Sequence, residues 1–99
     1  MANYILTNKA VEDLSGIWNY TFDFWSENQA DIYYNMLLDS CQELADEKLS
    51  GRNYPEITKE LFGLRVGQHI IFYRHQKKNT IEIVRILHKK MDLKNRVQE

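Results

Sequence analysis

The chain of 99 residues contains one cysteine, one proline and four glycines, and each scarcity limits what the protein can be. Cys41 has no partner for a disulfide within the chain, which favours a reducing compartment, and we expect the cytoplasm. Because glycine and proline are so few, long flexible linkers are not expected, and residues 1–99 are expected to form a single domain. No apolar run reaches the roughly 18 residues of a membrane span, and the N-terminus lacks the pattern of a secretion signal.

Metal ligands are also scarce. His69, His75, His88 and Cys41 do not follow the spacing of a metal site, so we expect no metal and no cofactor. Nothing near Cys41 in the sequence would activate it, and we expect a buried thiol on a helix face. His69 and His75 are expected at the surface, and His88 is interpreted as a structural residue at the end of a strand.

The net charge of −1 conceals an uneven distribution: residues 1–49 carry −7 and residues 50–99 carry +6. This polarity predicts a basic working surface beside an acidic, solvated one. For the acidic half, the alternative is that its helices simply have acidic outer faces. A plain nucleic-acid-binding module is disfavoured, because the chain has no recognition-helix or stacking motif and is not basic overall.

Two helices are predicted after a short strand at residues 2–7. The first begins near Thr7 or Asn8, and Ser26 to Gln29 form a capping box that begins the second, which ends at Ser50-Gly51. So short a connection makes the pair an antiparallel hairpin. The residues spaced by three and four are assigned to the apolar faces, and Gly16 is expected to permit close packing. The aromatic residues expected in the core are Trp18, Trp25, Tyr33 and Tyr34.

Strand patterns dominate after a loop at residues 52–56. Three strands are predicted at Leu61–Val66, His69–Arg74 and Thr80–His88, with a polar turn at residues 76–79 between the last two. The order β-α-α-β-β-β predicts an α+β fold, in which the helical hairpin packs on one face of a mainly antiparallel four-stranded sheet. The charged tail, residues 89–99, is expected to be a short helix or an arm.

The last two strands are apolar on both faces. Simple alternation places Ile70, Phe72 and Arg74 on one face of the first of them. It places Ile81, Ile83, Arg85 and Leu87 on one face of the second. The helical hairpin can cover only one side of the sheet, so either the tail or a partner chain must cover the other.

Two segments carry a family resemblance. Gly63–Arg74 and Ile81–Asp92, together with first-helix residues such as Asp13, Leu14 and Tyr20, resemble the ParE branch of the RelE/ParE toxin superfamily over nearly the whole chain. The resemblance implies the toxin of a type II toxin–antitoxin system, associated with plasmid stabilisation. It further implies that the toxin binds and inhibits DNA gyrase and is neutralised by a cognate antitoxin. The assembly would be a homodimer or a toxin–antitoxin heterotetramer, with no membrane component.

Two sets of site residues follow from the strand faces and this resemblance. The antitoxin is expected to contact Arg65, Ile70, Phe72, Arg74, Ile83 and Arg85, because arginine suits paired binding of carboxylates. The target is expected to contact the tail at His88, Lys89, Lys90, Met91, Asp92, Lys94 and Arg96. For the three arginines, the alternative is a structural salt bridge with acids of the helices.

The competing function is that of the RelE branch, ribosome-dependent cleavage of messenger RNA. Such cleavage needs a group that takes the 2′-proton, cations beside the phosphate and a donor to the leaving oxygen. His69 stands where that branch commonly has an arginine, and residues 89–99 contain neither tyrosine nor histidine. The sequence therefore favours a protein that acts by binding, with no catalytic residues.

Overall fold

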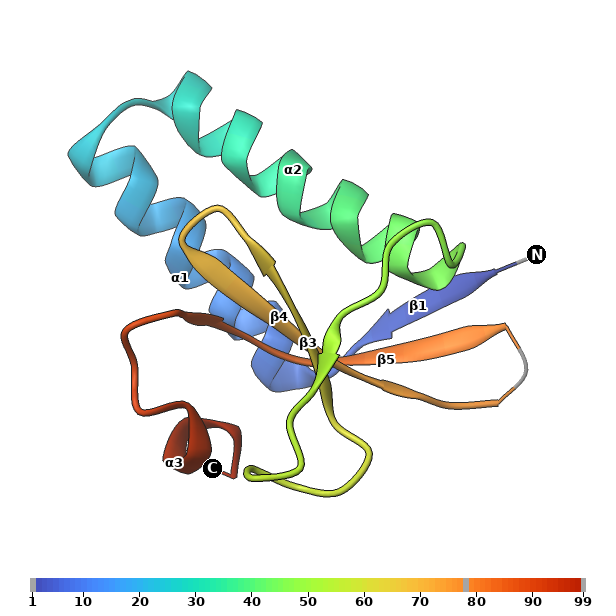
Figure 1. Cartoon of the computed structure of the whole chain (residues 1–99). Helices are drawn as coiled ribbons and strands as arrows, with labels where there is room; N and C mark the ends of the chain where they lie inside the picture. Colours follow the sequence, from blue (N-terminus) through green and yellow to red (C-terminus); the bar gives the residue numbers. More distant parts are fainter. Residues whose placement is uncertain (1, 78, 99) are drawn as a thin grey trace.

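The computed structural model describes residues 2–77 and 79–98. The elements follow the order β1 (Asn3–Leu6), α1 (Asn8–Phe24), α2 (Glu27–Ala45), β2 (Arg52–Asn53), β3 (Phe62–Val66), β4 (His69–His75), β5 (Thr80–His88) and α3 (Leu93–Val97). In the sheet the strands lie in the order β1-β5-β4-β3-β2, with β1 parallel to β5 and the other pairs antiparallel. Figure 1 shows α1 and α2 as an antiparallel pair beside the sheet. The predicted α+β fold is confirmed, and β2 adds two residues to the sheet within the expected loop.

Side-chain caps determine where the helices begin. The Thr7 hydroxyl accepts a hydrogen bond from the Ala10 N–H (3.0 Å) and donates one to the Val84 carbonyl (2.8 Å), so it ties the start of α1 to β5. The Ser26 hydroxyl accepts from the Gln29 N–H (3.0 Å), which confirms the start of α2.

The end of α2 differs from the prediction. The helix ends at Ala45, before the expected Ser50-Gly51, and Glu47 takes a left-handed conformation with φ 62°. The Lys48 N–H then donates to the Glu43 carbonyl at 2.9 Å, as in helix ends that usually employ glycine. Because a glutamate, and not a glycine, occupies the left-handed position, the sequence contains no signal for the end of α2 at this point.

The sheet has a hydrophobic core on each side. On the side of the helices, Leu14, Leu37, Cys41, Ile71 and Ile83 are among the buried residues. The core on the other side consists of Ile57, Leu61, Ile70, Phe72 and Leu87, with Tyr54, Val84, Leu93 and Val97 packed against it. The tail therefore does cover the second face, as one alternative predicted, and it shares that role with residues 54–61.

A β-bulge in β5 overturns the predicted grouping of its side chains. Phe72 lies opposite Arg85 and Tyr73 lies opposite Ile83, so Val84 is an extra residue in β5. Ile83 consequently packs in the core on the helix side, whereas Leu87 packs in the core on the other side. The prediction that both lie on one face is wrong, because the alternation reverses across the bulge.

The edge of β5 beyond the bulge is closed by a helix side chain. β1 pairs with β5 only as far as Ile83, so the next part of this edge has no neighbouring strand. The Asp13 carboxylate accepts from the Ile86 N–H (3.0 Å) and from the Arg85 guanidinium (2.8 and 3.0 Å). Arg85 also donates to the Arg96 carbonyl, so one side chain joins α1, the sheet and α3. We refer to this group of contacts as the Asp13–Arg85 clasp.

The connected ends of α1 and α2 extend past the β3–β4 turn (Figure 1). Trp25 is 75% exposed there, so its predicted place in the core is wrong. Trp18, Tyr33 and Tyr34 are half-buried. The prediction that Gly16 permits close packing is also wrong, since nothing lies within 4 Å of a Cβ built there. Helical periodicity reports which residues share a face but not how far the sheet reaches beneath them.

We expect Asp13→Ala to lower the free energy of unfolding by about 3 kcal/mol or more, because the buried Arg85 charge loses this carboxylate. The control is Arg52→Ala, which removes an ion pair whose side chains are 59% and 57% exposed. It should cost less than about 1 kcal/mol. Urea denaturation of both variants measures the difference, and equal losses would contradict a structural role for the clasp.

Candidate functional site

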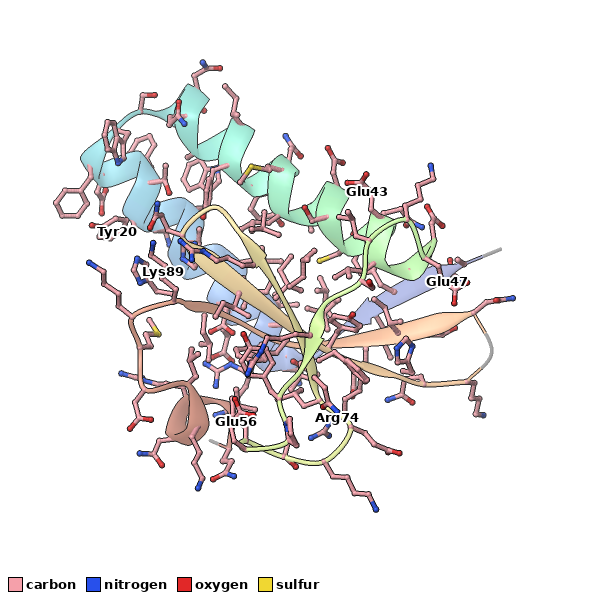
Figure 2. All side chains as sticks on the ribbon, viewed as in Figure 1. Tyr20, Glu43, Glu47, Glu56, Arg74 and Lys89 are labelled. Atoms are coloured by element: carbon pink, nitrogen blue, oxygen red, sulfur yellow. The ribbon has the colours of Figure 1, made fainter. Side chains whose placement is uncertain are left out.

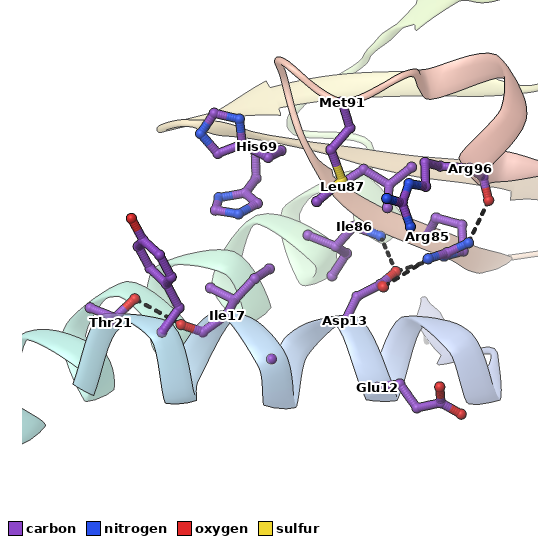
Figure 3. A pocket seen from close by; sticks show the side chains of 13 residues that line it. Glu12, Asp13, Ile17, Thr21, His69, Arg85, Ile86, Leu87, Met91 and Arg96 are labelled. Atoms are coloured by element: carbon purple, nitrogen blue, oxygen red, sulfur yellow. Dashed lines mark hydrogen bonds and ion pairs between the residues drawn. The ribbon is translucent and has the colours of Figure 1, made fainter. Parts of the chain in front are cut away.

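A cleft of about 470 Å³ lies between α1 and the segment that runs from the end of β5 toward α3. Its walls are mostly apolar, and Ile17, Ile86, Leu87 and Met91 are among the residues that form them. Figure 3 shows these side chains between α1 and the strand, with the Asp13–Arg85 clasp at one end and His69 toward the other. The cleft exists because a helix, whose side chains leave gaps, covers an edge that a neighbouring strand would have closed.

A chain of hydrogen bonds orients His69 at the start of β4. The Gln68 N–H donates to the Tyr33 hydroxyl oxygen at 3.0 Å, and that hydroxyl lies 2.7 Å from Nδ1 of His69. Nδ1 accepts the hydroxyl proton when the neutral ring carries its own proton on Nε2.

Burial reinforces the neutral state of His69. It lowers the pKa of His69 to about 4, with a further lowering from His88 and an opposing effect of Asp13. The His88 ring stands edge-on to His69, with centroids 5.4 Å apart, and its Nδ1 accepts from the Lys90 N–H at 3.1 Å. Both Nδ1 atoms are therefore engaged in hydrogen bonds within the chain.

The cleft brings together three of the residues assigned to the target. His88, Met91 and Arg96 line it. The structural role expected for His88 agrees with its position at the end of β5.

The other four residues of that set lie outside the cleft lining. The backbone of Lys89 is held by the Gln68 carbonyl at 3.0 Å, Asp92 caps α3, and the side chains of Lys90 and Lys94 are exposed. The tail therefore contributes Arg96 to the lining of the cleft and exposes two further cations to solvent.

The residues assigned to antitoxin binding do not form one surface in the structure. Ile70, Phe72 and Ile83 are buried within the chain, so the expectation that they form an exposed apolar face is wrong. Arg85 belongs to the clasp, which is the structural salt bridge left open by the sequence.

Arg65 and Arg74 remain available on the face away from the helices. Arg65 is exposed, and Arg74 is half-buried. Among the described residues, nothing accepts a hydrogen bond from the buried Nε of Arg74. Figure 2 shows Arg74 on the side of the sheet opposite α2, far from Tyr20.

Sequence reasoning missed Tyr33 and the role of Asp13 in this region. Tyr33 was assigned to the core, and nothing in its neighbourhood along the chain indicates a contact with His69, which lies 36 positions away. Asp13 was interpreted as an acid near the start of the first helix and as part of the family resemblance. An acid on the inner side of the first helix, combined with an arginine inside an apolar strand, is the signal that could have revealed the clasp.

Other candidate chemistries find little support in the described ranges. Cys41 is buried as expected, and burial raises its pKa to about 12, so the thiol stays protonated. In residues 2–77 and 79–98, no three side chains of His, Cys, Asp or Glu gather as a metal site would require. None of the helices described is long and apolar enough to cross a membrane. His75 is exposed as expected, whereas His69 is not a simple surface residue.

Comparison with known proteins gives consistent similarities. The family described as ParE toxin of type II toxin–antitoxin system, parDE, matches residues 4–93. Toxin ParE1 of Mycobacterium tuberculosis is 35% identical over 92 residues, which cover 93% of this chain and 94% of that protein. Toxin ParE of Escherichia coli is 31% identical over 99 residues, which cover all of this chain and 96% of that protein.

A solved structure supports the same fold. The chromosomal ParDE toxin–antitoxin system from P. aeruginosa contains a chain that superposes with a TM-score of 0.71 at 20% identity. The superposition covers 89% of this chain and 95% of that chain.

The lowered pKa of His69 predicts a loss of stability in acid. Its usual value, near that of an unfolded chain, is about 6.5. Between this value and about 4 the unfolded chain takes up a proton that the folded chain does not, so stability falls as the pH falls. Urea denaturation at pH 7.5 and 5 should show this loss, and His69→Gln should reduce it. His75→Gln, at an exposed histidine, should keep the wild-type loss, and an equal loss in His69→Gln would count against the assignment.

Proposed function

The chain belongs to the ParE family of toxins of type II toxin–antitoxin systems, and on that premise we propose that it inhibits DNA gyrase by binding the enzyme. The observation that carries this proposal is the match of the ParE family to residues 4–93, which include the parts of α1, β4 and β5 that line the cleft. We propose further that a cognate antitoxin neutralises it. Both partners are assigned by family membership, and the surfaces described above are the candidates for contacting them.

The chemistry of the cleft supports binding over catalysis. RNA cleavage through the 2′-hydroxyl needs a proton acceptor beside the phosphate. His69 and His88 use their Nδ1 atoms for internal hydrogen bonds, and Asp13 is engaged by Arg85 and Ile86. The apolar walls, with Arg96 in the lining and the exposed lysines of the tail, instead suit an apolar segment of a protein that carries acidic groups.

The proposed antitoxin surface is the face of the sheet away from the helices. Of the six residues first assigned to it, Arg65 and Arg74 are the ones retained. Burial of Ile70 and Phe72 removes the apolar part of the original expectation. Arg74 holds a buried Nε without an acceptor among the described residues, and a carboxylate of the antitoxin would supply one.

Purified toxin at micromolar concentration should inhibit supercoiling by gyrase and accumulate cleaved DNA. The double variant Lys90→Glu with Lys94→Glu should inhibit at least about tenfold more weakly, because like charges in an interface cost several kcal/mol. Lys9→Glu, at an exposed lysine at the start of α1, is the control and should inhibit normally. Absence of inhibition by the wild type would exclude gyrase as the target. A ribosome-bound message incubated with the toxin should stay intact, and its cleavage would favour the RelE-like activity.

Arg74→Ala should weaken antitoxin binding about tenfold to a hundredfold, because a charge-assisted hydrogen bond contributes about 1.5–3 kcal/mol. Stability should change little, since the Nε of Arg74 has no acceptor among the described residues of the free chain. Arg52→Ala, which removes an exposed arginine that already pairs with Glu56, is the matched control. Calorimetric titration with the antitoxin measures both variants. Unchanged affinity in Arg74→Ala and in Arg65→Ala would reject this face as the antitoxin surface.

A further inference from the structure

The end of the helical hairpin carries a group of aromatic side chains that are exposed or, for Trp18, half-buried. We define the aromatic tip as Trp18, Tyr20, Phe22, Phe24 and Trp25. Tyr20 is 62% exposed, Phe24 68% and Trp25 75%. These residues lie in the last two turns of α1 and at its C-cap, where the hairpin extends beyond the sheet (Figure 1). So many large apolar groups in one exposed place are uncommon on a protein that acts alone.

The aromatic tip is held in a definite shape. Trp18 stacks on Phe22 with ring centroids 5.2 Å apart, and Tyr20 lies against Phe24 at 4.5 Å. The indole N–H of Trp18 donates to a carboxylate oxygen of Asp31 at 2.9 Å, which ties α1 to α2 close to the turn. A surface ordered before binding loses little conformational entropy in a complex, which is the usual property of residues that dominate an interface.

The charge around the tip indicates the chemistry of its partner. Residues 18–36 contain Asp23, Glu27 and Asp31, and no lysine, arginine or histidine. A symmetric contact between two tips would bring like charges together, which disfavours a second copy of this chain as the occupant. A basic rim around an apolar groove would complement both the charge and the rings.

We propose that the aromatic tip docks into an apolar, basic-rimmed groove on the target of the toxin, as the main anchor of that complex. This inference rests on the proposed function and deepens it by naming the contact surface. Tyr20 belongs both to the tip and to the lining of the cleft, so the two surfaces are continuous along α1. Arg74 lies on the other side of the molecule (Figure 2), which leaves the proposed antitoxin surface separate from the tip.

The test is binding of the double variant Phe24→Ala with Trp25→Ala to the gyrase holoenzyme by surface plasmon resonance. Affinity should fall at least about a hundredfold, because central aromatic anchors each contribute about 2 kcal/mol or more. Thermal unfolding should change little, because both side chains are exposed. Val11→Ala, 48% exposed and at the other end of α1, is the matched control and should bind as the wild type does.

Asp23→Lys tests the charge part of the proposal. A lysine near the C-terminus of α1 suits the helix dipole, so the fold is kept. Gyrase binding should weaken, and the difference from the wild type should shrink as salt is added. Equal affinity of Asp23→Lys and the wild type would reject a basic rim.

The outcomes separate the two proposals. If the wild type binds gyrase and the double variant binds equally well, the aromatic tip is not the anchor and the proposed function stands. If the wild type does not bind gyrase, the proposed target and the docking inference both fail. If sedimentation shows a wild-type dimer that the double variant loses, the occupant is a second copy, and the inference is overturned.

Discussion

The structure depends on the way in which the edge of β5 is closed. β1 is only four residues long, so the strand edge beyond Ile83 would expose backbone groups to solvent. Asp13 reaches from α1 to accept the Ile86 N–H, and it neutralises Arg85 in the same contact. Arg85 in turn holds the carbonyl of Arg96. One carboxylate thus joins the helical layer, the sheet and the tail, and a break in this contact would loosen all three.

The same arrangement creates the surfaces on which the proposed function rests. A helix at a strand edge leaves the cleft, and α1 continues from the cleft to the aromatic tip without interruption. The acidic charge of the first half of the chain gathers on this hairpin, while the basic second half supplies the tail and the arginines of the far face. The charge asymmetry seen in the sequence therefore corresponds to separate surfaces of the folded chain.

Some of this arrangement could be predicted, and the reasons for the rest are physical. Helical spacing, the Ser26 cap and the runs of β-branched residues report local preferences, so the order of elements was confirmed. The bulge at Val84 was not predictable, because a single extra residue leaves no mark in composition yet reverses the faces of Ile83 and Leu87. Ile57 lay outside every predicted element and Leu61 was assigned to the start of a strand, although both complete the second core. Trp25 was misplaced because periodicity does not tell where the sheet beneath a helix ends.

By itself the sequence determined the helical hairpin, the antiparallel strands, the surplus of apolar strand residues and the likeness to ParE toxins. These properties follow from local propensity and pattern, which act over a few neighbouring residues. Tertiary structure alone decided that Arg85 is a structural residue, that His69 is a neutral ring bound to Tyr33, and that the aromatic end of α1 remains exposed. Each of these depends on groups 36 to 72 positions apart, or on where one layer stops above another. Contacts over such separations exist only once the chain has packed.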